Sequence, residues 1–226
     1  HSNQQQLMLA RSKIYLFGIA PLILFFVLVS ACNRQPDACL ETSTTSSLVG
    51  SPIIVRDCSK RGFDNVINMG NGAKFNNEQE INYTYYSGGS YRIALTSFSR
   101  KGNKKETSET GITITYPSAK DIQGNWTLTK AETRIQLLVD PTVSIFNLPI
   151  DSSRNFSELY EITADSIFVT HNREKFYLFQ FRNVYEYENG SLKLNQNSFP
   201  IVRYSGSEMV LQGPYFKGFE LLYLER

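Results

Sequence analysis

Chemically versatile side chains are scarce in this sequence of 226 residues, which contains two histidines, three cysteines and one tryptophan. Only one of the histidines, His171, lies beyond the first 31 residues. Zinc sites need about four clustered nitrogen or sulfur ligands, and acid–base catalysis needs titratable groups held together. The sequence also lacks the nucleophile-elbow, His-Glu-x-x-His and P-loop motifs. We therefore expect no enzyme activity, no metal and no cofactor.

An excess of charge of one sign is also missing. The sequence has 23 Lys+Arg and 21 Asp+Glu, a net charge of +2. Phosphate recognition needs clustered basic residues, so nucleic acid is excluded as a partner. The basic pairs Arg100-Lys101 and Lys104-Lys105 flank a glycine turn. They could contact anionic lipid headgroups or glycans, although the favoured interpretation is that they keep an exposed hairpin soluble.

The first 31 residues contain Arg11 and Lys13, no acidic residue, and an apolar run over residues 14–29. A basic start, a hydrophobic middle and small residues at the end are typical of a secretory signal. The run of 16 residues is slightly short for a membrane span and contains Pro21. A plain secretory signal or a membrane span followed by an incidental cysteine is the alternative.

The apolar run ends in Ser30-Ala31-Cys32. Small residues before a cysteine at this point resemble the cleavage box of bacterial lipoproteins, here of the Bacteroidota type. The resemblance implies that residues 1–31 are a helical signal peptide and that Cys32 becomes the lipid-bearing first residue. It also implies a cell-envelope location, with the membrane as a partner through the lipid anchor and the outer membrane as the expected site.

Two cysteines remain after Cys32, namely Cys39 and Cys58. An exported compartment permits disulfides, and an even number of remaining thiols favours one bridge. We predict a disulfide between these two residues, with a pair of buried free thiols as the alternative. Residues 32–38 are polar and are expected to be a short tether.

Residues 39–117 alternate between apolar and polar positions and are interrupted by glycine turns. Strands are expected near 40–45, 52–57, 65–68, 80–85, 90–99 and 107–115, a pattern typical of an immunoglobulin-like sandwich. Residues 67–72, which end in Gly70-Asn71-Gly72, resemble the Trp-Asp-Phe-Gly-Asp-Gly motif of PKD domains. Residues 82–85, 89–95 and 112–114 fit later segments of that family. The glycines and tyrosines agree, whereas the tryptophan and both acids of the motif are replaced.

Residues 118–226 contain a second series of short strands separated by hairpin turns. They are expected near 124–128, 134–139, 159–163, 166–170, 175–181, 185–187, 191–194, 201–204, 208–211 and 219–224. So many consecutive strands suit an up-and-down barrel. Gly124-Asn125-Trp126 resembles the opening of lipocalin-like domains. The resemblance implies that Trp126 plugs one end of the barrel and that a basic residue of the last strand, Arg226, lies over its ring. The alternative is an ordinary core tryptophan.

Residues 175–188 are the one stretch whose composition suggests a ligand site, because apolar residues occupy both faces of a strand. Phe179 and Phe181 could line a lumenal pocket. The favoured interpretation is barrel core combined with contact to the first domain, and a partner surface is a third possibility.

The predicted protein is therefore all-β, an immunoglobulin-like sandwich followed by a lipocalin-like barrel on a lipid anchor. The predicted function is non-catalytic binding or scaffolding in the cell envelope, with a glycan or an envelope protein as partner. The alternative is a carrier of a small hydrophobic ligand in the barrel. Sequence alone leaves the identity of the ligand open.

Overall fold

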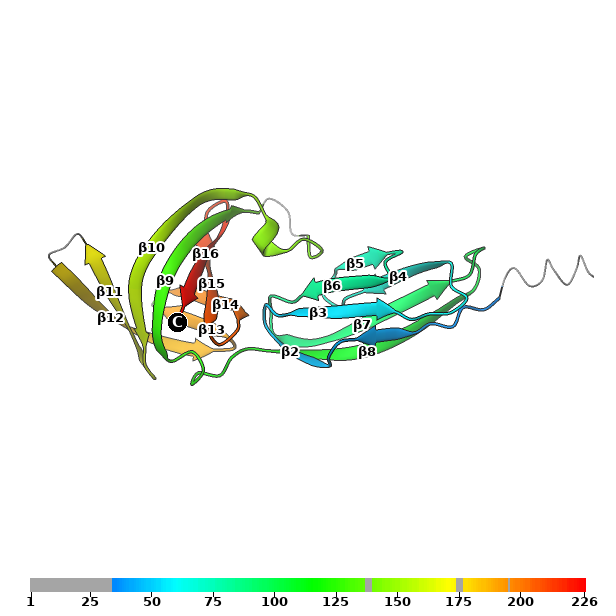
Figure 1. Ribbon diagram of the computed structural model, residues 1–226, viewed down its shortest axis with the longest axis horizontal. Helices are drawn as coiled ribbons and strands as arrows, with labels where there is room; N and C mark the ends of the chain where they lie inside the picture. The colour runs from blue at the N-terminus through cyan, green and yellow to red at the C-terminus, as the bar shows by residue number, and fades with distance from the viewer. Residues whose placement is uncertain (1–33, 137–139, 174–176, 195) are drawn as a thin grey trace, which may run out of the picture.

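The protein is an all-β molecule in which two strand modules follow one another along the long axis (Figure 1). The structure, a computed structural model, describes residues 34–136, 140–173, 177–194 and 196–226, without the side chains of residues 171–182. The helical content of these residues is one 3-10 turn, η1 (Ile145–Asn147). No helix within the described ranges is long and apolar enough to cross a membrane.

The first module is a sandwich of two sheets, as predicted. One sheet has the order β1-β3-β6 and the other β2-β8-β7-β4-β5. The strands are β1 (Leu40–Thr42), β2 (Ser46–Leu48), β3 (Pro52–Asp57), β4 (Asp64–Asn68), β5 (Lys74–Asn76), β6 (Glu80–Thr84), β7 (Gly89–Phe98) and β8 (Lys105–Thr115). The sequence did not predict β2 and β5, because three residues are too few to show a period of two.

The sandwich core follows from alternation along the strands. Ile53 and Val55 of β3 and Ile93 and Leu95 of β7 are each at most 1% exposed, whereas the residues between them are more exposed. Successive side chains of a strand point to opposite faces, so one face of each sheet is apolar and the two faces pack together.

A disulfide between Cys39 and Cys58 closes the sandwich at the end where the described chain begins, which confirms the predicted bridge. The two cysteines flank the antiparallel pair β1–β3, in which Leu40 lies opposite Asp57. The Cys58 amide also donates to the Cys39 carbonyl, at 3.0 Å. Linking residues 19 apart in sequence stabilises a domain by roughly 3 kcal/mol in the chain-entropy account.

The second module is a closed barrel with the order β10-β11-β12-β13-β14-β15-β16-β9. The strands are β9 (Gly124–Ile135), β10 (Ile150–Ile162), β11 (Ser166–Arg173), β12 (Tyr177–Glu188), β13 (Ser191–Leu194), β14 (Asn197–Tyr204), β15 (Glu208–Tyr215) and β16 (Gly218–Glu225). Each strand pairs antiparallel with the next, and β16 returns to β9. The predicted up-and-down barrel is therefore correct.

Two strands are much longer than the sequence suggested. β9 covers 12 residues and β10 covers 13, where we expected separate short strands at 124–128 and 134–139 and a single one at 159–163. The β9–β10 register shifts between Asn155 and Glu158. Such bulges bend a strand and change which residues face inward, so they interrupt the simple alternation on which the prediction depends. Residues 137–139 lie outside the described ranges.

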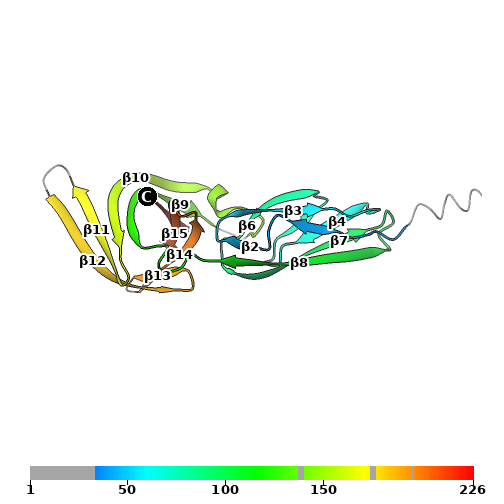
Figure 2. The same cartoon turned by 60° about the horizontal axis from the view of Figure 1, so that its bottom comes forward.

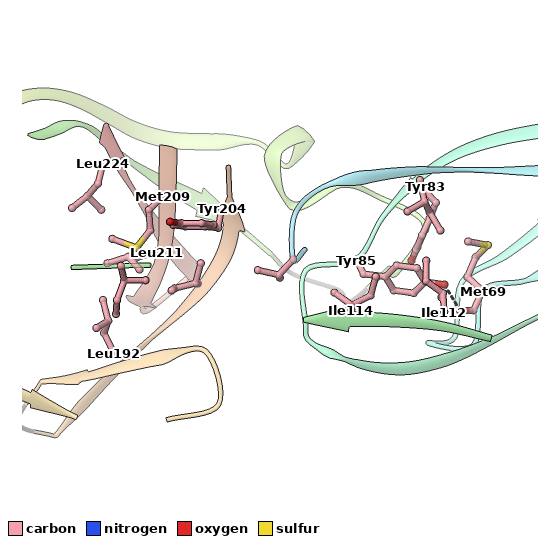
Figure 3. Packing of buried hydrophobic residues seen from close by; sticks show 14 of the residues in the cluster. Met69, Tyr83, Tyr85, Ile112, Ile114, Leu192, Tyr204, Met209, Leu211 and Leu224 are labelled. Atoms are coloured by element: carbon pink, nitrogen blue, oxygen red, sulfur yellow. Dashed lines mark hydrogen bonds between the residues drawn. The ribbon is translucent and has the colours of Figure 1, made fainter. Parts of the chain in front are cut away.

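Side chains fill the barrel next to the sandwich. Leu192, Tyr204, Met209, Leu211 and Leu224 converge there from β13 to β16 (Figure 3). The same buried cluster continues into the sandwich through residues such as Val49 and Tyr85. The described part of the barrel interior is therefore a packed core at this end.

A second apolar cluster lies on the outside of the barrel. It contains Val202, Val210, Phe219, Leu221 and Tyr223, with Ile145, Phe146, Leu148 and Tyr86 packed against it. Three of these covering residues come from the connection between β9 and β10, residues 140–149, and Tyr86 comes from the sandwich. The half-buried residues of this connection therefore cover part of the outer barrel wall, while others such as Val143 and Asn147 stay exposed.

Two buried charged residues of β9, Glu132 and Arg134, link the barrel to this connection. Arg134 is 7% exposed and donates from Nη1 to the Leu148 carbonyl, at 2.7 Å. It also pairs with Glu132, which accepts from the Tyr223 hydroxyl at 2.8 Å. Burial raises the pKa of Glu132, but hydrogen bonds from Lys130, Tyr223 and Arg134 outweigh it, and the pKa lies below the ordinary value.

Candidate functional site: the cleft between the modules

The sandwich and the barrel meet through close backbone contacts. The Tyr204 amide donates to the Val49 carbonyl at 3.3 Å. A Cβ atom on Gly50 would lie 2.4 Å from the Arg203 Cα, and one on Gly190 would lie 2.1 Å from the Tyr116 ring. Both glycines also have positive φ, +77° and +75°. Only glycine fits at such positions. These two glycines therefore allow the sandwich and the barrel to approach each other closely.

The β9–β10 connection forms a second bridge back to the sandwich. The Tyr83 hydroxyl donates to the Pro141 carbonyl at 2.8 Å, and the hydroxyls of Tyr86 and Ser144 lie 2.6 Å apart. The Tyr86 ring meets the Phe146 ring edge-on, with centroids 5.6 Å apart. The two modules are therefore joined at two separate places.

Between the sandwich and this connection lies a cleft with two lobes, of about 320 and 290 Å³. The lobes share Tyr83, Thr84, Tyr86, Pro141 and Val143. One lobe extends to residues of β3 and β6, and the other to the Gly70-Asn71-Gly72 turn and the start of β7. The further lining residues are Pro52, Asn71, Asn82, Ser87, Tyr91, Gln136, Asp140, Thr142, Ser144, Ile145 and Leu148. Together the lobes reach the size of a small-molecule site.

Aromatic rings form one wall of the cleft. Tyr83, Tyr86 and Tyr91 line it. The buried Tyr85 lies behind them, edge-on to Tyr83 with centroids 4.9 Å apart and stacked on Tyr91 at 4.2 Å. The turn residue Asn71 donates from its side-chain amide to the Tyr83 hydroxyl, at 2.8 Å. The pKa of Tyr83 is raised, mainly by burial. These tyrosines therefore remain neutral hydrogen-bonding groups at physiological pH.

Asp140 is the one charged residue among the described residues that line the cleft. It accepts from the Thr142 hydroxyl at 2.7 Å and from the Thr142 amide at 2.9 Å. These hydrogen bonds lower its pKa, so Asp140 is an anion at neutral pH. As the one carboxylate among these lining residues, Asp140 has no second carboxylate beside it in the described lining. The described lining instead presents rings, amides and hydroxyls.

The structure brings the predicted pair Trp126 and Arg226 together. Trp126 is fully buried and donates from Nε1 to the Ile122 carbonyl at 2.8 Å. The guanidinium carbon of Arg226 lies 4.3 Å from the centroid of the Trp126 ring. Arg226 also donates to the carbonyls of Gln123 and Gly206, at 3.0 and 2.6 Å. Arg226, in the segment after β16, thereby contacts the start of β9 and the turn between β14 and β15 at one end of the barrel.

The other predicted positions have different outcomes. Cys32 lies outside the described residues, as do the side chains of Phe179 and Phe181. Both views place the β11–β12 hairpin at the end of the barrel away from the sandwich (Figures 1 and 2). We expected residues 175–188 to contact the first module. Among the described side chains of this stretch, the contact lies at the end of β12, where the Tyr187 hydroxyl donates to the Pro117 carbonyl at 2.6 Å.

Cys39, Glu41 and Cys58 place their ligand-type atoms within 4.8 Å of one another. Both sulfur atoms are already joined in the disulfide, and metal binding requires free thiolates. This group is therefore a structural feature and not a metal site in the oxidised protein.

Sequence reasoning missed the cleft. Its two walls, around Tyr83 and Pro141, are 58 residues apart in sequence. The only local signal was the density of tyrosines in residues 83–86, and we interpreted that segment as an ordinary strand.

No family model matches this chain, and no curated protein does. Among solved structures, the chain is similar to the PKD1 domain of Vibrio anguillarum Epp, at 24% identity over 38% of this chain and 99% of that one, with a TM-score of 0.32. It is also similar to the PKD1 domain of the Vibrio cholerae metalloprotease PrtV, at 24% identity over 36% and 98%, with a TM-score of 0.31. A third similar structure comes from work on the promiscuous specificity of carbohydrate-binding modules of the β-sandwich superfamily. Its identity to this chain is 10% over 85% of this chain and 91% of that one, with a TM-score of 0.35. At these TM-scores the similarity identifies neither a family nor a ligand.

Proposed function

We propose that the mature chain is a cell-envelope lipoprotein, anchored through Cys32 in the outer membrane, that binds a neutral glycan without catalysis in the cleft between sandwich and barrel. The observation that carries the proposal is the chemistry of the cleft, in which tyrosine rings, amides and hydroxyls surround one isolated carboxylate, Asp140.

A glycan matches this lining better than other ligand classes do. Sugar hydroxyls pair with amide, hydroxyl and carboxylate groups, and the apolar face of a sugar ring packs on an aromatic ring. Phosphates and acidic sugars would meet the Asp140 anion without a compensating cation among the described lining residues. The lobes are also too polar for a purely hydrophobic ligand, which would cover the exposed Asn82 side chain and deprive it of water.

The proposed anchor is supported by the order of the sequence up to Cys32 and by the disulfide, which suits an exported protein. The described chain begins at residue 34, at the end of the sandwich away from the barrel (Figures 1 and 2). An anchor at Cys32 would therefore leave the cleft facing away from the membrane and open to a polymer.

Calorimetric titration of the purified protein tests the binding step, with neutral glucan, mannan, xylan and galactan oligosaccharides as probes. Asn82→Ala and Tyr86→Phe each remove one hydrogen-bonding group, so affinity should fall about 3- to 10-fold for each. Asn76→Ala is the matched control, because Asn76 is exposed on β5 outside the cleft. Unchanged affinity in both cleft variants, or cleavage of a bound oligosaccharide, would refute the proposal.

Mass spectrometry of the N-terminal peptide from a membrane fraction tests the anchor separately. We expect a lipid-modified Cys32 at the first position. Cys32→Ser should prevent lipid attachment and cleavage before residue 32. A bare thiol at Cys32 in the native protein would contradict the lipoprotein assignment and leave the binding step unaffected.

A further inference from the structure

We propose that the β7–β8 hairpin and the neighbouring Phe63 form a surface that docks on anionic phospholipid headgroups of the membrane that holds the anchor. This inference rests on the proposed lipid anchor at Cys32. The surface consists of residues 100–105 together with Lys60 and Phe63.

The hairpin concentrates positive charge at the end of the sandwich where the described chain begins. Residues 100–105 are all exposed and contain four basic residues and no acidic one. Asp64 and Glu106 lie one step behind the tip, since Asp64 pairs in register with Phe98 and Glu106 with Ser97. The outermost part of the hairpin is therefore positive.

An exposed aromatic ring accompanies these charges. Phe63 is 64% exposed, although large aromatic side chains are mostly buried in a folded protein. The guanidinium carbon of Arg100 lies 5.9 Å from the centroid of its ring. A basic group beside an exposed phenyl ring is the combination that suits the interface of a bilayer, where the charge meets phosphate and the ring enters the acyl boundary.

The tether brings this surface to the anchor. The Gln35 side chain donates to the Lys105 carbonyl at 2.9 Å, and Asp37 pairs with Lys60 in a β-bridge. Gln35 lies three positions after Cys32 in the sequence, and a fully extended chain advances at most about 3.6 Å per residue. A lipid anchor at Cys32 would therefore be at most about 11 Å of extended chain away from a residue that contacts the hairpin.

The lipid on Cys32 would begin at the headgroup level, so this short tether would hold the hairpin close to the bilayer. Lysine and arginine side chains extend their charges several ångströms beyond the backbone. Charge complementarity then selects anionic headgroups, and near an anionic surface each basic side chain contributes about fivefold to binding.

Limited trypsin digestion tests the docking on the lipidated protein, purified from its membranes and reconstituted into vesicles. One set of vesicles is pure phosphatidylcholine, and the other contains about one third phosphatidylglycerol. Cleavage within residues 100–105 should be at least about tenfold slower on the anionic vesicles. Salt at 0.5 M, where screening acts within about 4 Å, should restore it. Lys120, exposed between the modules, serves as the internal control and should be cleaved equally on both.

A second measurement does not depend on the trypsin sites. Phe63→Trp should shift its emission to the blue and be quenched by lipids with brominated tails on anionic vesicles but not on neutral ones. Replacing Arg100, Lys101, Lys104 and Lys105 with glutamine should abolish that difference, whereas emission from the buried Trp126 should stay unchanged.

The outcomes separate this inference from the anchor. Equal cleavage on both vesicles by a protein whose Cys32 is lipidated would overturn the docking surface and leave the anchor intact. Protection that is equally strong on neutral vesicles would also overturn it, because proximity alone would then explain the effect. A native protein without lipid on Cys32 would overturn both.

Discussion

Removing the arginine that covers Trp126 should destabilise the barrel. In Arg226→Ala the protein loses a cation–π contact at 4.3 Å and charged hydrogen bonds to the carbonyls of Gln123 and Gly206. The cation–π contact contributes about 0.5–2 kcal/mol. Each charged hydrogen bond contributes about 1.5 kcal/mol or less here, because Arg226 is exposed and water replaces part of the loss. We expect the free energy of unfolding to fall by roughly 2–3 kcal/mol.

The chain provides its own reporter for this measurement. Trp126 is the only tryptophan in the sequence and is fully buried, so its emission follows the opening of the barrel. Urea titrations of the parent protein and of Arg226→Ala, fitted by linear extrapolation, give the difference in free energy.

Arg226→Lys is the matched control. Lysine keeps the positive charge but lacks the planar fork that reaches several carbonyls at once, so this variant should lose about half as much stability. A change below about 0.5 kcal/mol in Arg226→Ala would refute the reasoning, since Arg226 would then cover the ring without stabilising the barrel.

Three further predictions concern other parts of the molecule. Replacing Cys39 and Cys58 with serine should lower the stability of the sandwich by roughly 3 kcal/mol in urea unfolding followed by circular dichroism. Thr142→Val removes a hydroxyl donor, so carboxyl NMR titration should show the pKa of Asp140 rising toward its ordinary value. Stability that arises from the lowered pKa is present at neutral pH and is lost as the pH falls through the folded-state value. Tyr223→Phe should cost about 1.5–3 kcal/mol in thermal unfolding, because the buried Glu132 loses a donor; a loss below 0.5 kcal/mol would contradict this assignment.

Local alternation was enough to predict the two modules. Ile112 and Ile114 alternate with Thr113 and Thr115 in one strand, and glycine turns separate such strands, so the all-β architecture follows from short stretches of sequence. The length of β10 did not follow, because its first half carries exposed polar residues such as Ser152 and Arg154. That half of β10 is a strand because it pairs with β9. The sequence of β10 alone does not show which segment it pairs with.

The cover formed by residues 140–149 was unpredictable for a related reason. Glu132 and Arg134 are separated by one residue and look like a solvated strand face, yet they are buried beneath residues 140–149. A buried ion pair cannot be distinguished from an exposed one by spacing. The covering connection could be inferred only from the apolar residues Ile145, Phe146 and Leu148, which have no neighbouring strand pattern to explain them.

The length of the sandwich has a geometric consequence. β8 runs for 11 residues from the basic hairpin to the junction, and at about 3.3 Å per residue it spans about 36 Å. If the hairpin docks on the bilayer as we propose, the length of this strand would fix the distance between the membrane and the cleft. Glycan chains that lie flat on the lipid surface would then not reach the cleft. Only glycan chains that extend to the height of the cleft could bind there.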